Sequence, residues 1–207
     1  MKDQIFNIKS EQDFKKVALQ VFRHQFENNK VYRSFCDLLY VHYSDVKKVE
    51  DIPFLPIQFF KSHQIVSSLD EIEETFTSSG TTGSITSKHL VTDIDVYKES
   101  YLKGFHQFYG NIEDYVVLAL LPNYLERQGS SLIFMVEDLI KKTKNSESGF
   151  FLNNLNELTQ KLVKLEKKGQ KVLLIGVTFA LLDLIEQQKF QLKNTIIMET
   201  GGMKGMR

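Results

Sequence analysis

The chain has 207 residues, of which 42% are hydrophobic, enough to bury a full core as one domain or as one lobe with a helical appendage. Its 26 basic and 26 acidic residues balance, so no surplus charge attracts nucleic acid or an anionic membrane surface, and neither partner is expected. The single cysteine, Cys36, excludes an intrachain disulfide framework and a multi-cysteine zinc site. No apolar run is long enough to span a membrane, and a reducing, cytoplasmic location is expected.

The first fifty residues have the spacing of helices. Ser10 and Asp13 resemble a capping box, and apolar residues from Phe14 to Phe26 then recur at helical intervals, which predicts a helix of about four turns. Residues 31–39 predict a second helix. Residues 1–50 are therefore expected to form a helical cap.

A segment rich in proline and aromatic residues follows the cap. Pro53 and Pro56 exclude a regular helix at residues 51–56. Two interpretations remain open for the apolar side chains between Phe54 and Phe60. They pack against a core, which is the commoner fate of such residues, or they line a substrate channel.

From Thr75 onward, short apolar runs alternate with helical stretches, which is typical of an α/β sheet. The run from Tyr115 to Leu121 is continuously apolar and predicts a central strand buried on both faces. The predicted fold is α/β, with the helical cap followed by a mixed or parallel sheet flanked by helices over residues 51–207. The other predicted strands are residues 75–77, 89–92, 171–177 and 195–199, and the predicted helices are residues 96–109, a helix after Ser130, 155–168 ended by Gly169, and 179–188 capped by Thr178.

The last predicted strand runs into Gly201 and Gly202, and a sheet rarely ends on such an edge. We therefore expect the chain to be the N-terminal portion of a longer protein.

The segment Ser78-Ser79-Gly80-Thr81-Thr82-Gly83-Ser84 has the properties of a polyphosphate-binding loop. Its glycines permit positive φ and close backbone approach, its hydroxyls add hydrogen-bond donors, and Lys88 supplies a nearby cation. A flexible linker has a similar composition. The predicted flanking strands favour a binding site. The loop is not a Walker A motif, which needs Gly-Lys-Ser/Thr at the start of a helix.

This loop resembles the phosphate-binding signature of the AMP-forming ligase superfamily, which includes acyl-CoA synthetases, phenylacetate-CoA ligases and the acyl-protein synthetases of bacterial luminescence. The last branch is the most similar, because it shares a segment like Ile52-Pro53-Phe54-Leu55-Pro56 before the loop and a stretch like residues 120–131 after the central strand. The lysine that usually follows the loop stands two residues later in this chain, at Lys88. The resemblance covers about residues 50–207.

The resemblance implies a set of ligands and roles. ATP would bind with its phosphates at residues 78–84 and its adenine at Gly201, Gly202 and Met203. Lys88 and His89 are the candidate catalytic residues. Mg²⁺ is expected as a second cofactor, but no metal ligand is assigned in this chain, because the motif that carries it would lie beyond Arg207.

The implied reaction is attack of a fatty or aryl carboxylate on the α-phosphorus of ATP, followed by acyl transfer to a thiol of coenzyme A or of a protein. Cys36 is not assigned as that thiol, since its apolar helical surroundings favour a buried structural role. Two alternatives remain: a lobe that holds nucleotide without turnover, and a structural lobe whose loop is only a linker.

The remaining candidates carry weaker signals. No pair of the five histidines has a metal-ligand spacing, and structural or surface roles are expected for those other than His89. Residues 129–131 lack the elbow motif of serine hydrolases. Tyr124, Glu126 and Arg127 follow a predicted strand, where α/β proteins bind ligands, so they either face the acyl site or make ordinary surface contacts.

Overall fold

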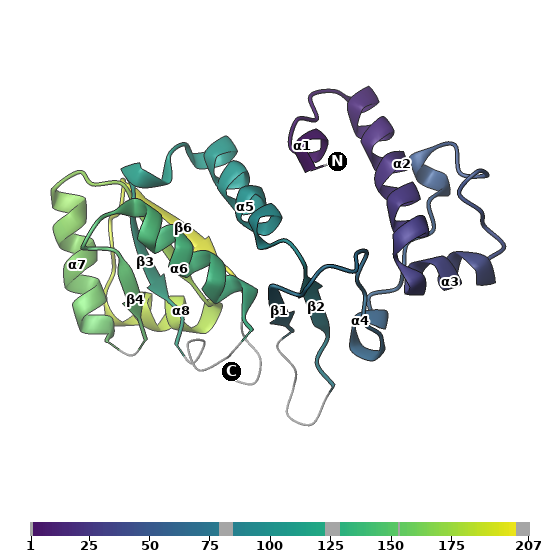
Figure 1. Cartoon of the computed structure of the whole chain (residues 1–207). Helices are drawn as coiled ribbons and strands as arrows, with labels where there is room; N and C mark the ends of the chain where they lie inside the picture. Colours follow the sequence, from purple (N-terminus) through teal and green to yellow (C-terminus); the bar gives the residue numbers. More distant parts are fainter. Residues whose placement is uncertain (1, 79–84, 123–128, 153, 202–207) are drawn as a thin grey trace. The chain divides into compact units, whose positions relative to one another are not determined.

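A computed structural model of the chain describes residues 2–78, 85–122, 129–152 and 154–201 (Figure 1). The chain divides into two compact units, Met1–Ser100 and Tyr101–Arg207. The helix α5 (Ile94–Tyr109) crosses from one unit into the other. The predicted boundary near residue 50 lies inside the first unit and stays a prediction.

The first unit begins with three helices, α1 (Lys2–Ile5), α2 (Glu11–Asn28) and α3 (Lys30–Leu38). The backbone N–H of Asp13 donates to Ser10 Oγ at 3.1 Å, and the Ser10 hydroxyl donates to Asp13 Oδ2 at 2.8 Å. The first of these bonds satisfies an otherwise unpaired N–H of the first helical turn. Both helices predicted in this region are confirmed, as is the capping pair that starts the longer one.

The structure confirms the packing interpretation for part of the proline segment. The segment follows a 3₁₀ turn, η1 (Val49–Asp51), and ends in the short helix α4 (Phe59–Ser62). Ile52 and Leu55 pack against the apolar cluster of α2 and α3, and the Tyr32 hydroxyl donates to the Pro53 carbonyl at 2.6 Å. Phe54 instead keeps 76% of its surface exposed. The segment is thus packed against the core at some positions and exposed to solvent at others.

The strands β1 (Glu74–Thr77) and β2 (Lys88–Val91) pair antiparallel as a two-stranded sheet of their own. Both strands were predicted, and the structure confirms them. It also separates them from the larger sheet, so the α/β sheet of the prediction begins only in the second unit. The Glu73 carboxylate accepts the Ile94 backbone N–H at 2.9 Å, which ties the start of β1 to the start of α5.

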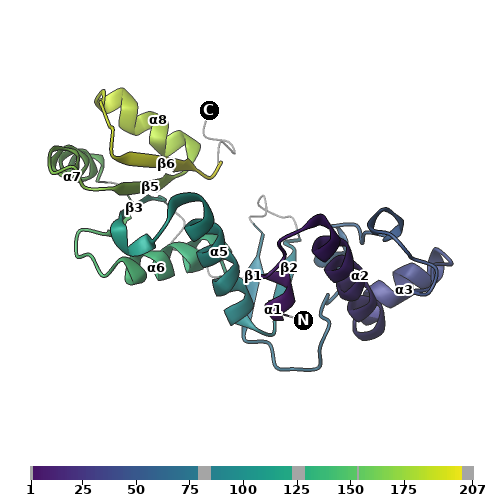
Figure 2. The same ribbon diagram turned by 90° about the horizontal axis from the view of Figure 1, so that it is seen from above.

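The second unit contains a four-stranded parallel sheet in the order β4-β3-β5-β6. Helix α6 covers one face of this sheet, and α7 and α8 cover the other (Figure 2). The elements of this unit are η2 (Ile112–Asp114), β3 (Val116–Leu120), α6 (Ser131–Thr143), β4 (Gly149–Phe151), α7 (Leu155–Lys167), β5 (Val172–Gly176), α8 (Thr178–Gln187) and β6 (Thr195–Glu199).

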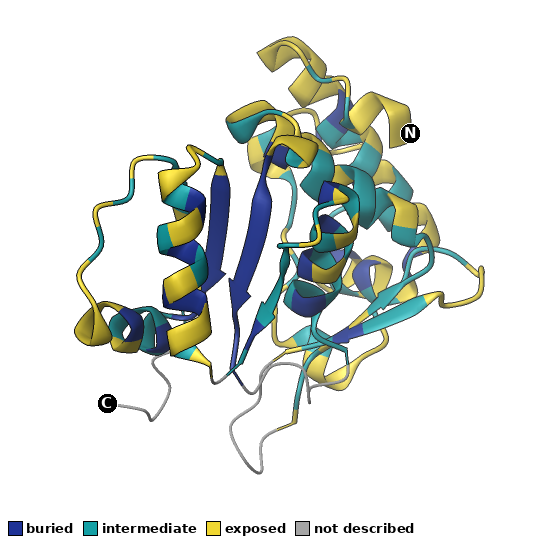
Figure 3. Ribbon diagram, turned by 90° about the vertical axis from the view of Figure 1, so that its left-hand side faces the viewer, coloured by how far each residue is buried: buried dark blue, intermediate teal, exposed yellow. Residues whose placement is uncertain are grey.

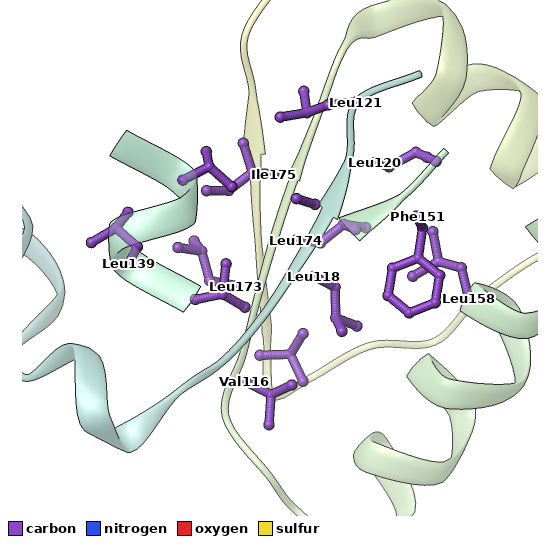
Figure 4. Packing of buried hydrophobic residues seen from close by; sticks show 14 of the residues in the cluster. Val116, Leu118, Leu120, Leu121, Leu139, Phe151, Leu158, Leu173, Leu174 and Ile175 are labelled. Carbon is purple, nitrogen blue, oxygen red and sulfur yellow. The ribbon is translucent and has the colours of Figure 1, made fainter. Parts of the chain in front are cut away.

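The two central strands are buried along their whole length (Figure 3). Leu118 and Leu174 stand side by side in the register and have at most 1% of their surfaces exposed. Figure 4 shows Leu173 near Leu139 of α6 and Leu118 on the side of Leu158 of α7. Burial on both faces explains why these strands are continuously apolar, and it confirms the prediction of a central strand at residues 115–121.

One capping prediction is wrong. Val177, not Thr178, occupies the N-cap position of α8, and it makes no side-chain capping bond. The Thr178 hydroxyl donates instead to the Glu199 carboxylate at the end of β6. Because Glu199 belongs to a strand distant in sequence, the sequence around Thr178 does not reveal this contact.

Glu166 on α7 holds the turn that leads into β6. Its carboxylate accepts the backbone N–H groups of Lys193 and Asn194 at 3.0 and 3.1 Å and the Asn194 side-chain amide at 2.9 Å. These bonds, the Lys193 backbone N–H foremost, favour the charged form and lower the pKa of Glu166 below its ordinary value of 4.5.

Replacing the Glu166 carboxylate should therefore destabilise the fold by an amount that depends on pH. The pKa of Glu166 is lower in the folded chain than in the unfolded one. The stabilisation by the Glu166 carboxylate is therefore fully present above the ordinary pKa, and it is lost as the pH falls through the pKa of the folded chain. Glu166→Gln should lower the denaturant midpoint at neutral pH, and the difference should shrink below about pH 4. Glu137→Gln, on the exposed side of α6, serves as the control with no expected change. A midpoint difference independent of pH would contradict this role for the Glu166 charge.

Candidate functional site

The predicted phosphate loop joins the two strands of the hairpin. The backbone N–H of Ser78 donates to the Ser87 carbonyl at 3.0 Å, and the Ser87 N–H donates to Ser78 Oγ at 3.0 Å. This reciprocal pair closes the stem from which the loop leaves. The remaining predicted loop residues, Ser79, Gly80, Thr81, Thr82, Gly83 and Ser84, lie outside the described residues.

A cavity of about 590 Å³ lies against this stem. Lys88 from β2 and Lys61 from α4 line it, together with His63, Thr75 and Thr86. Among its described lining residues there is no aspartate or glutamate. We call this space the basic cavity. Two ammonium groups without an opposing carboxylate suit an anionic ligand such as a phosphate or a carboxylate.

The hairpin register separates the two candidate catalytic residues. Lys88 stands opposite Thr77, and His89 stands opposite Phe76. Neighbouring side chains of a strand point to opposite faces of the sheet, so Lys88 and His89 do not share a face. His89 is absent from the lining of the basic cavity, and its ring lies 6.0 Å from that of Phe60. Of the two, the structure brings only Lys88 to this cavity.

The second predicted half of the site lies at the carboxyl end of the parallel sheet. The strand order reverses between β3 and β5, and folds of this kind bind ligands at the carboxyl ends of the strands around such a reversal. Gly176 ends β5, where an added Cβ would lie 2.8 Å from the Leu181 side chain, so a larger residue here would require Leu181 to shift.

Hydrogen bonds organise this edge. The Thr200 N–H donates to the Gly176 carbonyl at 3.0 Å, and the Thr178 N–H donates to the Gly201 carbonyl at 3.1 Å. The Gly201 N–H donates to Glu199 at 2.7 Å, and Gly201 adopts a φ of +78°. Gly201 is thus held in a glycine-favoured conformation at the sheet edge. Gly202 and Met203 lie outside the described residues, as do Tyr124, Glu126 and Arg127.

Three contributors to these sites were not predicted. Lys61 and His63 line the basic cavity from a segment that the sequence presents chiefly as packing material. The only local signal is that a lysine and a histidine follow closely on an aromatic cluster. Glu199 organises the edge of β6, and no motif marks it. Among the described residues, no group of three or more histidine, cysteine, aspartate or glutamate side chains is placed to hold a metal ion.

Comparison with known proteins identifies the family. A family model described as "Acyl-protein synthetase, LuxE" matches residues 5–115, more than half of the chain. The chain belongs to this family. The matched segment contains both strands of the hairpin, the loop between them and the residues that line the basic cavity.

Two relatives illustrate the similarity. The chain is 39% identical over 70 residues to a long-chain-fatty-acid–luciferin-component ligase of Photorhabdus luminescens, covering 33% of this chain and 60% of the relative. It is 40% identical over 63 residues to a ligase of the same name from Vibrio harveyi, covering 30% of this chain and 16% of the relative. The chain thus spans less than two thirds of either relative. No solved structure matches it. None of the described helices is long and apolar enough to cross a bilayer.

Cys36 lies fully buried in the cluster formed by α2 and α3. Burial raises the pKa of its thiol, since the thiolate would lose its hydration. Both properties disfavour a nucleophilic role.

The thiol of the native chain should therefore react slowly with iodoacetamide. Alkylation should be about a hundredfold or more slower than in guanidinium chloride, because the side chain reacts only after local opening. Mass spectrometry of quenched samples measures both rates on the same residue, as the chain has one cysteine. Native alkylation at the rate of the unfolded chain would contradict the buried structural role of Cys36.

Proposed function

We propose that this chain is part of an enzyme that activates a long-chain fatty acid with ATP, as an acyl-adenylate, and passes the acyl group to a thiol. Membership of the LuxE family supports an acyl-protein synthetase, and the relatives' names supply the substrate class, a long-chain fatty acid. The observation that carries the proposal is the basic cavity, where Lys61 and Lys88 line a space beside the stem of the predicted phosphate loop.

The proposed first step joins two anions. A carboxylate oxygen attacks the α-phosphorus of ATP, the bond from that phosphorus to the oxygen bridging to the β-phosphate breaks, and pyrophosphate leaves. Catalysis of such a step consists chiefly of positioning and of neutralising negative charge. Lys61 and Lys88 supply fixed positive charge on the stem side, and the predicted loop supplies backbone and hydroxyl donors. No side chain of this chain is needed as a base.

The proposed second step transfers the acyl group. A thiol of coenzyme A or of a protein cysteine attacks the acyl carbon, AMP leaves, and the thiol proton is lost to solvent. Cys36 is not proposed as this thiol, because its side chain is buried. We also propose that His89 takes part in the reaction and that Gly201, Gly202 and Met203 bind the adenine.

Mg²⁺ is proposed as the companion ion of ATP. The described residues contain no cluster of acidic side chains that would hold it, so no step is assigned to it.

A negative charge introduced into the predicted loop should weaken nucleotide binding. Gly80→Asp places a carboxylate where phosphate oxygens are proposed to bind, and we expect ATP affinity to fall at least about tenfold by calorimetry. Gly104→Asp is the matched control: it makes the same change in charge on α5, where a Cβ would meet nothing within 4 Å. Lys88→Met should weaken ATP binding less than Gly80→Asp, because one exposed lysine contributes modestly.

Exchange of pyrophosphate into ATP, started by a long-chain fatty acid, tests the first step. Equal ATP affinity in the Gly80→Asp, Gly104→Asp and unaltered chains would refute the loop as the phosphate site. Nucleotide binding without any acid-dependent exchange would favour a lobe that holds nucleotide without turnover.

A further inference from the structure

Two cavities of the first unit share a wall. Phe60 lines both the basic cavity and a second space of about 570 Å³, and the residues between Phe60 and Ile65 divide between them. Lys61 and His63 face the basic cavity, whereas Ile65 faces the second space. We call this second space the apolar cavity.

The apolar cavity is built by one face of α2 and by the proline segment. Phe14, Val17, Ala18 and Val21 recur at helical spacing along α2 and line one side. Phe54 lies on the other side with 76% of its surface exposed. The volume of the apolar cavity falls in the range of about 300–1,000 Å³ that is typical of ligand pockets.

The polar side chains of the apolar cavity already make hydrogen bonds to one another or to the backbone. The Asn29 amide donates to Gln25 Oε1 at 3.1 Å, and Asn29 Oδ1 accepts the backbone N–H of Tyr32 at 3.1 Å. The Tyr32 hydroxyl donates to the Pro53 carbonyl at 2.6 Å. A charged ligand group placed at this end would have to break such bonds, whereas an alkyl chain leaves them intact.

The charge of the basic cavity is local. The whole chain has equal numbers of basic and acidic residues, yet the described lining of this cavity contains Lys61, His63 and Lys88 and no acid. An anionic head therefore finds charge complementarity on one side of Phe60, and an apolar tail finds apolar surface on the other.

We propose that the first unit is the fatty-acid-binding unit, with the alkyl chain in the apolar cavity and the carboxylate in the basic cavity beside Lys61. The proposal rests on the proposed function for its ligand class, a long-chain fatty acid, and it adds the place and the direction of binding. It also brings the carboxylate to the stem of the loop that is proposed to hold ATP. The family match includes every described lining residue of both cavities.

Binding of saturated fatty acids to the full chain, without ATP, tests this placement. Competition against a fluorescent fatty acid across the series from octanoate to dodecanoate should show affinity rising about three- to fourfold per added methylene. Each acid is compared with its methyl ester, which keeps the tail and loses the charge. We expect the acid to bind more tightly than the ester.

Variants locate the two ends of the ligand. Ala18→Phe fills the apolar cavity from α2 and should lower affinity more than about tenfold for every chain length. Phe54→Ser should lower it about fivefold, whereas Phe108→Ser should leave it within about twofold. Phe108 is the matched control, since it is 75% exposed but lies in the other unit. Lys61→Met should remove most of the preference for acid over ester, while the dependence on chain length persists.

The outcomes separate this inference from the proposed function. Absence of fatty-acid binding, or binding that Ala18→Phe leaves unchanged in a chain with a native circular dichroism spectrum, would overturn the placement even if ATP binds. Equal effects of Phe54→Ser and Phe108→Ser would also overturn it, because they indicate non-specific adsorption. Binding with the expected chain-length and variant dependence would support the placement even if no pyrophosphate exchange is found, in which case only the adenylation proposal fails.

Discussion

The antiparallel pairing of β1 with β2 is the constraint on which the candidate site depends. Its register puts Lys88 opposite Thr77 and His89 opposite Phe76, and strand geometry then directs consecutive side chains to opposite faces. A slip of one residue would exchange the two faces and remove Lys88 from the basic cavity. The reciprocal bonds between Ser78 and Ser87 hold this register at the mouth of the loop. A short stem thus determines which cation accompanies the proposed phosphate site.

Much of this architecture follows from periodicity. The buried strands β3 and β5 were predictable because both faces must be apolar, and α2 because its cap and its apolar spacing agree. The strand β4 was missed, since Gly149-Phe150-Phe151 is too short to show alternation, and it is defined by pairing with β3. The role of Thr178 was misjudged because its partner, Glu199, is distant in sequence.

The site itself was less predictable than the fold. Glycines and hydroxyls mark residues 78–84 as a candidate loop, but nothing local shows that Lys61 lines the same cavity as Lys88. That relation arises because α4 packs against β2, a tertiary contact without a sequence period. The proline segment is divided in a similar way. Leu55 joins the core, as the packing interpretation predicts, while Phe54 borders a cavity.

The apolar cavity also bears on stability. Space next to apolar side chains forfeits dispersion contacts, and exposed aromatic surface such as that of Phe54 forfeits hydrophobic stabilisation. Collapse of the proline segment onto α2 would recover both. The Tyr32–Pro53 hydrogen bond and the packing of Ile52 and Leu55 hold the segment at some points and leave Phe54 beside open space. This space next to two lysines has the combination of surfaces that an amphipathic anion requires, and an alkyl chain bound there would contact these apolar side chains.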